Sequence, residues 1–101
     1  MPAVHTPITN VSVSTQVVPS HSGRISLYIR NYQGSSGTIW AALGQAATAG
    51  SNGEIEIVPG GEYTWSGVMT PIDSGMSYIP TDSVNVIISG GAATGAVVEY
   101  L

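Results

Sequence analysis

Glycine and proline interrupt this chain so often that they leave little room for long helices. The 101 residues include 13 glycines and 6 prolines, placed at short intervals. Between them lie short runs rich in valine, isoleucine, threonine and tyrosine, the residues that favour β-strands. Such chains fold as sheets of short strands joined by tight turns. We therefore expect an all-β protein.

The clearest strand signal is an alternation of apolar and polar residues. The valines at 11, 13 and 17 share one face and the serines at 12 and 14 share the other, as a half-buried strand requires. Residues 41–49 are ambiguous, because their alanines favour helix while Gly44 interrupts them. We interpret them as a strand end and a loop, with a short helix as the alternative. The expected strands are 10–18, 24–31, 38–43, 54–58, 62–68, 77–79, 83–89 and 96–101.

About eight short strands at such regular spacing predict one sandwich domain. The expected fold is a single-domain antiparallel β-sandwich over residues 10–101, similar to a jelly roll, with the strand order left open. Residues 1–9 show no periodicity and contain Pro2 and Pro7. We interpret them as an extended N-terminal arm that becomes ordered against a partner, with a frayed terminus as the alternative.

The charge composition excludes several classes of partner. The chain has no lysine, two arginines and six carboxylates, for a net charge of −4. Such a surface repels phosphate backbones, so we expect no nucleic-acid partner. No apolar run reaches the length of a membrane span, and the first ten residues lack the basic and apolar regions of a signal peptide, so we expect neither a membrane partner nor a secretion signal. The absence of cysteine excludes disulfides and thiolate metal sites.

The residues that usually carry catalysis form no recognisable site. His5 and His21 lie in segments rich in proline and serine, with no carboxylate at a metal-ligand spacing. Glu54 and Glu56 share a strand face, which could serve glycoside hydrolysis or calcium binding, but a solvent-facing strand explains them. The glycine-rich stretch 90–95 lies between two strands, which favours a turn over a dinucleotide loop. We expect no enzyme activity, no cofactor and no metal.

The aromatic residues allow two interpretations. Trp40, Tyr63 and Trp65 could form a stacking platform for sugars, which would make the chain a small carbohydrate-binding module. Alternatively, several aromatic residues belong to the core or to subunit contacts, because a sandwich needs large side chains and this chain has no phenylalanine. We favour the second interpretation and keep a glycan partner as the alternative.

The expected surface suits a subunit of a static assembly. Its outward faces carry small polar residues, and only 8% of the residues are charged. Short side chains lose little entropy on docking. A weakly charged surface also protects a free monomer poorly against association.

Three segments resemble small virion proteins of tailed bacteriophages. They are 24–31 (RISLYIRN), 38–44 (TIWAALG) and 52–61 (NGEIEIVPGG). The likeness extends over residues 11–101 and includes the strand at 84–89 and the ending at 97–99. This resemblance implies a head decoration (cement) or head-fibre subunit, or a neck or tail component, and it implies no catalytic residues.

From the surface and the resemblance together we expect a capsid decoration subunit that binds the outside of a phage head and stabilises the shell. It would be made in the host cytoplasm, reside in the virion, and contact the major capsid protein or another virion protein as a homo-oligomer, with a trimer favoured. Arms, aromatic residues and arginines are the usual interface anchors, and we expect the arginines to pair with carboxylates across an interface. The candidate partner-binding residues are Pro2, Val4, His5, Pro7, Arg24, Tyr28, Arg30, Trp40, Tyr63 and Trp65.

Overall fold

The computed structural model describes residues 3–50, 55–66 and 80–101. Over these ranges the chain forms eight strands and no helix, which confirms the all-β expectation. The expected strand at 77–79 lies outside the described residues. The strands are β1 (Ala3–Ile8), β2 (Thr15–Val18), β3 (Ser26–Asn31), β4 (Thr38–Leu43), β5 (Ile55–Ile57), β6 (Glu62–Ser66), β7 (Val84–Ser89) and β8 (Gly95–Tyr100).

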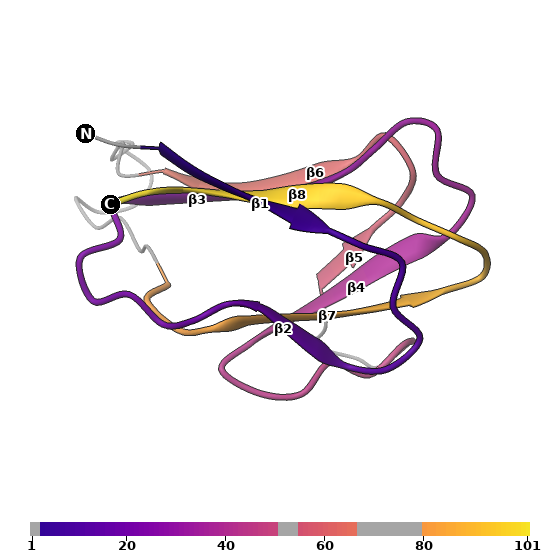
Figure 1. Cartoon of the computed structure of the whole chain (residues 1–101), viewed down its shortest axis with the longest axis horizontal. Helices are drawn as coiled ribbons and strands as arrows, with labels where there is room; N and C mark the ends of the chain where they lie inside the picture. The colour runs from indigo at the N-terminus through magenta and orange to yellow at the C-terminus, as the bar shows by residue number, and fades with distance from the viewer. Residues whose placement is uncertain (1–2, 51–54, 67–79) are drawn as a thin grey trace, which may run out of the picture.

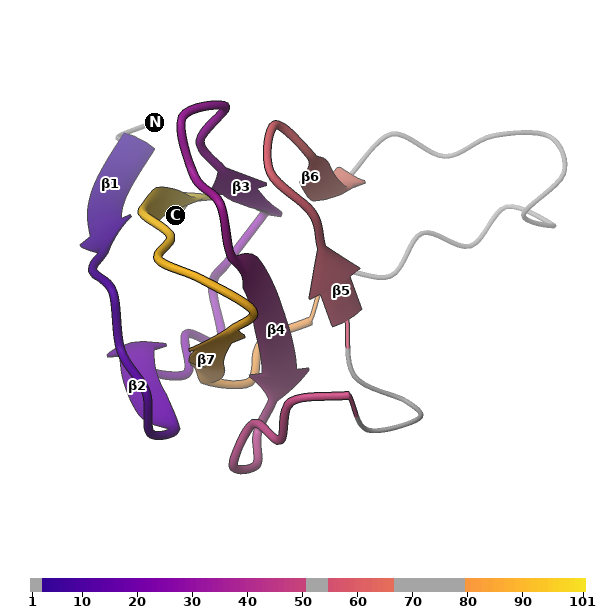
Figure 2. The ribbon, with the colours of Figure 1, turned by 90° about the vertical axis from the view of Figure 1, so that its right-hand side faces the viewer.

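The strands form two antiparallel sheets that pack face to face (Figures 1 and 2). Sheet A has the order β1-β8-β3-β6, and sheet B has the order β2-β7-β4-β5. The first strand therefore pairs with the last, the second with the seventh, the third with the sixth and the fourth with the fifth. This nested pairing is the strand order of a jelly roll. The expected jelly-roll sandwich is confirmed, and its strand order is now defined.

The hydrophobic core lies between the two sheets and follows the alternation of the central strands. In β3, Leu27 and Ile29 face the core and are fully buried, whereas Tyr28 between them faces outward. Full burial of one such aliphatic side chain stabilises the fold by roughly 1.5–3 kcal/mol. The core residues with no exposed surface are Leu27, Ile29, Ile39, Ala41, Val84, Val86 and Val97.

Two glycines set the geometry of sheet A. A Cβ atom on Gly95, the first residue of β8, would overlap the carbonyl oxygen of Arg30 on the neighbouring strand β3. Gly60 has a φ of +79°, which only glycine adopts readily, in the turn before β6. In that turn Gly60 N–H donates to the Asn31 carbonyl, and Asn31 N–H donates to the Gly61 carbonyl, both at 3.0 Å. The turn thereby aligns β6 with β3.

The N-terminal segment differs from the expected arm. Residues 3–8 form β1, an edge strand that pairs with β8 from Ala3 opposite Tyr100 to Ile8 opposite Gly95. Ile8 is only 2% exposed and belongs to the core. Because burial and main-chain pairing both hold this segment, it is part of the domain without any partner. The expected strand 10–18 is correspondingly shorter, since only Thr15–Val18 is strand and Val13 is 68% exposed.

Candidate functional site

The outer face of sheet A brings together residues from all four of its strands. One row across this face consists of His5, Val98, Tyr28 and Thr64, which lie opposite one another in the strand register. The next row consists of Pro7, Ala96, Arg30 and Glu62. These residues alternate with the core residues of the same strands, so they point away from sheet B. We call these two rows, together with Ser26 and Tyr100, the outer face of sheet A.

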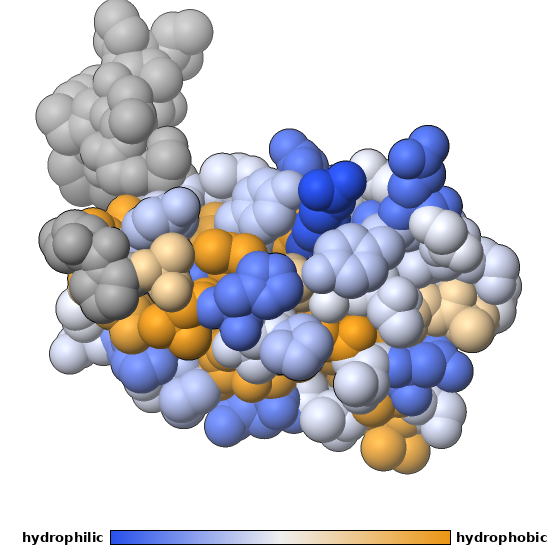
Figure 3. Space-filling model, turned by 45° about the horizontal axis from the view of Figure 1, so that its top comes forward, coloured by the Kyte–Doolittle hydropathy of each residue, from blue (hydrophilic) through white to orange (hydrophobic). Residues whose placement is uncertain are grey.

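An apolar hollow lies on this face. Its volume is about 330 Å³. Of its lining residues, Tyr28 and Val98 are partly buried and Tyr100 is 44% exposed. Figure 3, which looks obliquely onto this side, shows hydrophobic side chains at the surface between hydrophilic ones. The hollow is lined by Ser26, Leu27, Tyr28, Thr64, Val98 and Tyr100.

A polar cluster borders the hollow. The Tyr28 hydroxyl donates to Glu62 Oε2 at 2.7 Å. This hydrogen bond, desolvation and the charge of Glu62 raise the pKa of Tyr28 above its usual value of 10.0, while Arg30 opposes the shift. The guanidinium carbon of Arg30 lies 6.0 Å from the centre of the Tyr32 ring, at the outer limit of a cation–π contact. The cluster therefore offers an exposed cation between two tyrosines.

Four of the predicted partner-binding residues lie together on the outer face of sheet A. They are His5 and Pro7 from β1, and Tyr28 and Arg30 from β3. His5, Pro7 and Arg30 are exposed and Tyr28 is partly buried. Val4, in contrast, lies on the opposite face of β1, and Pro2 lies outside the described residues.

The other predicted aromatic residues occupy two different places. Trp40 lies on the outer face of sheet B, where its Nε1–H donates to Ser89 Oγ at 2.9 Å. Tyr63 and Trp65 lie on the core side of β6, with ring centres 4.6 Å apart and planes tilted by 46°. Trp65 packs against the core, and Tyr63 is 45% exposed. The three residues therefore form no common platform of the kind that a sugar-binding surface would use.

Arg24 is placed differently from the expected interface position. It is only 4% exposed, and its Nε and Nη2 donate to Glu99 Oε2 at 2.9 and 2.7 Å. Nη1 donates to the carbonyls of Pro80 and Asp82, both at 2.8 Å, and Nη2 also donates to the Pro19 carbonyl at 3.1 Å. A buried guanidinium that is bonded on all sides has no donor left for a partner. Arg24 fastens the end of the sandwich instead of an interface.

Two buried polar residues were missed by the sequence interpretation. Glu99 is 1% exposed and Asn31 is fully buried, with Asn31 Nδ2 donating to the carbonyls of Gly37 and Ile57 at 3.0 and 2.9 Å. The sequence held a signal for both, because Glu99 lies two residues after Val97 and Asn31 lies two residues after Ile29. Residues two apart in a strand share a face. Both side chains were therefore on core-facing positions. What the alternation could not supply was the identity of their partners.

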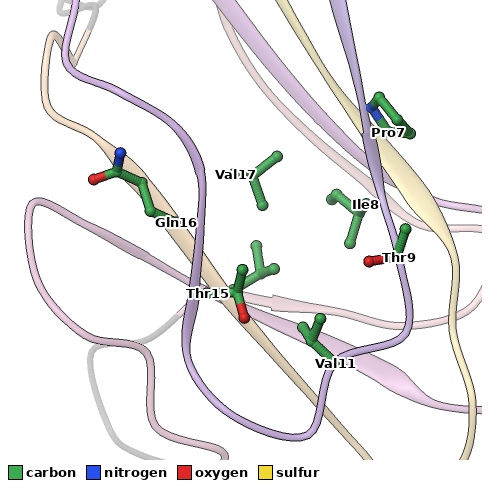
Figure 4. Close-up of a pocket in the computed structure, with 8 residues that line it drawn as sticks. Pro7, Ile8, Thr9, Val11, Thr15, Gln16 and Val17 are labelled. Atoms are coloured by element: carbon green, nitrogen blue, oxygen red, sulfur yellow. The ribbon is translucent and has the colours of Figure 1, made fainter.

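A second hollow, of about 140 Å³, lies at the edge of the sandwich where β1 and β2 approach (Figure 4). Thr9 and Thr15 supply hydroxyl groups, and valines and Ile8 supply apolar surface, whereas the Gln16 amide points away from the other lining residues. None of its lining residues is titratable, so the hollow offers no side chain that could act as a general acid or base. Seven of the lining residues are Pro7, Ile8, Thr9, Val11, Thr15, Gln16 and Val17.

The described residues contain no group of three or more histidines or carboxylates placed to hold a metal ion. Over the same ranges, no helix has the length and hydropathy needed to cross a membrane. Comparison of the chain with family models, with curated proteins and with solved structures finds no match.

Proposed function

We propose that this chain is a virion structural protein, a capsid decoration subunit that docks on the outer surface of a phage head. The observation that carries the proposal is the outer face of sheet A. There the apolar hollow, which Tyr28 and Tyr100 line, lies together with the exposed Arg30. The resemblance of segments 24–31, 38–44 and 52–61 to small phage virion proteins supports the same role.

The chemistry of this face indicates how it would dock. Tyr28 and Val98 would supply apolar contact, and aromatic residues and arginine are enriched at interface cores. Of the two arginines, both in the described part of the chain, only Arg30 is exposed. It would pair with a carboxylate of the capsid protein and fix the orientation. The remaining surface carries few charges, so long-range attraction would contribute little to binding.

The size of the face favours binding through several copies. Four strands about 4.8 Å apart and about 20 Å long cover roughly 300–400 Å². A stable one-to-one complex buries about 800 Å² on each partner. One copy would therefore bind weakly. A homo-oligomer that engages several shell sites would gain affinity through its high effective concentration.

Gold-labelled antibody imaging of virions from the source lysate tests the location. Label spread evenly over the heads is the expected result. Label confined to the neck or tail would keep the protein in the virion but overturn the decoration role. If no particle is labelled and sugars quench the tryptophan fluorescence, the carbohydrate-binding alternative replaces the proposal.

Sedimentation of the recombinant protein with purified heads tests the docking face. Tyr28→Ala and Arg30→Ala should each weaken binding at least tenfold, because both residues lie at the proposed contact. Gln16→Ala is the matched control, since Gln16 is exposed on the other sheet. Equal binding by all three variants would show that another face contacts the shell.

A further inference from the structure

The four edge strands of the sandwich differ in how well they are protected against pairing with another chain. β1 contains Pro7, which lacks an N–H donor. β2 has four residues and a register shift between Gln16 and Val18, and β5 has three residues. Proline, irregularity, shortness and charged side chains are the usual devices that block an edge. β6 has no proline and no irregularity, it spans five residues in continuous register with β3, and its one charged residue, Glu62, accepts the hydrogen bond from Tyr28.

The main-chain groups of Glu62, Thr64 and Ser66 point to the free side of β6. Asn31 N–H donates to the Gly61 carbonyl. The odd-numbered residues of β3 therefore direct their main-chain N–H and C=O groups towards β6. Hydrogen-bonding residues alternate along an antiparallel ladder. The main-chain groups of Tyr63 and Trp65 therefore bond to β3. Those of the residues between and beside them point away from β3, towards the edge of the sheet. No described strand pairs with that side, since β6 ends the order of sheet A (Figure 2).

We propose that β6 of one copy pairs antiparallel with β6 of a second copy, about a twofold axis through Thr64. In this register Thr64 lies opposite Thr64, Glu62 opposite the position of Ser66, and Tyr63 opposite Trp65. The pairs Glu62–Ser66, Thr64–Thr64 and Ser66–Glu62 of the two copies exchange two main-chain hydrogen bonds each. Aromatic pairs and threonine pairs across strands are favourable, and no like charges face each other. The sequence of β6 is thus complementary to itself.

The surface beside this edge is of a kind that a second copy would cover. Tyr63 in β6 is 45% exposed, and Val58, four residues before the strand, is 52% exposed. Thr64 also lines the apolar hollow of the outer face, so two hollows would adjoin across the axis. The result is one continuous sheet made of two copies of sheet A. Because a twofold contact closes on itself, it gives a dimer, in contrast to the trimer expected from the sequence.

Thr64→Pro tests the pairing selectively. Proline at this position removes an N–H that faces the free edge and leaves the bonds to β3 intact. Thr64→Val is the matched control, because it keeps the N–H and the branched side chain. Multi-angle light scattering over roughly 1–500 µM should show dimers for the native chain and Thr64→Val, since small interfaces are weak and concentration-dependent. Thr64→Pro should stay monomeric.

Cross-linking gives a second measurement that does not require a proline variant to fold. The chain has no cysteine, so Thr64→Cys introduces the only thiol, at a point that meets its symmetry mate. Paired strands hold opposite Cα atoms about 5.5 Å apart, within disulfide range. Oxidation should yield a covalent dimer, whereas Gln16→Cys on the irregular edge of β2 should not. A monomeric or trimeric native chain, or equal cross-linking of both cysteine variants, would overturn the proposal; neither result depends on binding to a phage head.

Discussion

Arg24 and Glu99 are the residues on which the end of the sandwich most depends. Arg24→Met would remove the arginine partner of the Glu99 carboxylate, which is 1% exposed, and would free three carbonyls, leaving His21 Nε2 at 3.8 Å as the nearest basic group. Removing one member of a buried ion pair typically costs about 3–5 kcal/mol. We expect that loss in the free energy of unfolding, measured by urea denaturation. A loss below about 1 kcal/mol would show that the site relaxes or admits water.

The double variant Arg24→Met/Glu99→Met separates the cost of an unpaired charge from the value of the pair. Replacing a buried pair by hydrophobic residues is often close to neutral. The double variant should therefore recover most of the stability lost in Arg24→Met. If its loss equals the sum of the two single losses, the two residues are not coupled.

Tyr28 and Glu62 provide a second prediction at the residue scale. The pKa of Tyr28 is raised above 10.0, first by its hydrogen bond to Glu62. The folded protein therefore holds this proton more tightly than the unfolded chain does. The associated stability is present below pH 10 and is lost as the pH rises through the folded pKa. Glu62→Gln should move the pKa of Tyr28 back towards 10.0.

Absorbance of tyrosinate measures this shift. Subtracting the titration of a Tyr28→Phe counterpart isolates Tyr28 from the other four tyrosines. Arg30 lowers the same pKa, so Arg30→Ala should move the curve in the direction opposite to Glu62→Gln. An unchanged titration in Glu62→Gln would mean that the Tyr28–Glu62 hydrogen bond is absent in solution.

At the scale of elements, β1 decides whether the N-terminal segment is an arm or part of the sheet. Ile8 is 2% exposed and belongs to the core. Ile8→Ala should cost about 2–5 kcal/mol, the usual range for such a buried truncation. Val4→Ala is the matched control, because Val4 is on the same strand but 38% exposed, and it should cost far less. Thermal or urea unfolding distinguishes the two, and equal small losses would restore the free-arm interpretation.

The sequence predicted six strands well, since the expected ranges for β3 to β8 fall within two residues of the observed bounds. The alternation of apolar and polar residues is clearest in β3 and β7, where every second residue is buried. β1 was missed because an edge strand that contains proline shows no such alternation. The strand order and the Arg24–Glu99 pair were also out of reach, since the strand order places Ala3 opposite Tyr100 and the ion pair joins residues 75 positions apart. Local patterns carry no information on such pairings.

At the scale of the whole molecule, the jelly roll separates residues on an exposed face from residues that stabilise the fold, a difference that the sequence could not supply. Of the ten predicted partner-binding residues, His5, Pro7, Tyr28 and Arg30 share one outer face, whereas Arg24 holds the fold together. Residue type alone made the two arginines equivalent. Their difference arises because Arg30 lies on β3 in an outward position, whereas Arg24 lies in the loop between β2 and β3 and donates to Glu99 of β8.

The proposed function makes a quantitative prediction for the shell. A protein that binds assembled heads but not free capsid subunits stabilises each occupied site by mass action. At a free concentration of about 100 times Kd, this amounts to about 2.7 kcal/mol per site. The melting temperature of purified heads should therefore rise with the logarithm of added protein. Tyr28→Ala should shift this dependence to higher concentration without changing its slope, because it weakens binding and leaves the number of sites unchanged. If the melting temperature of the heads stays unchanged when the binding sites are saturated, the protein decorates the head without stabilising it.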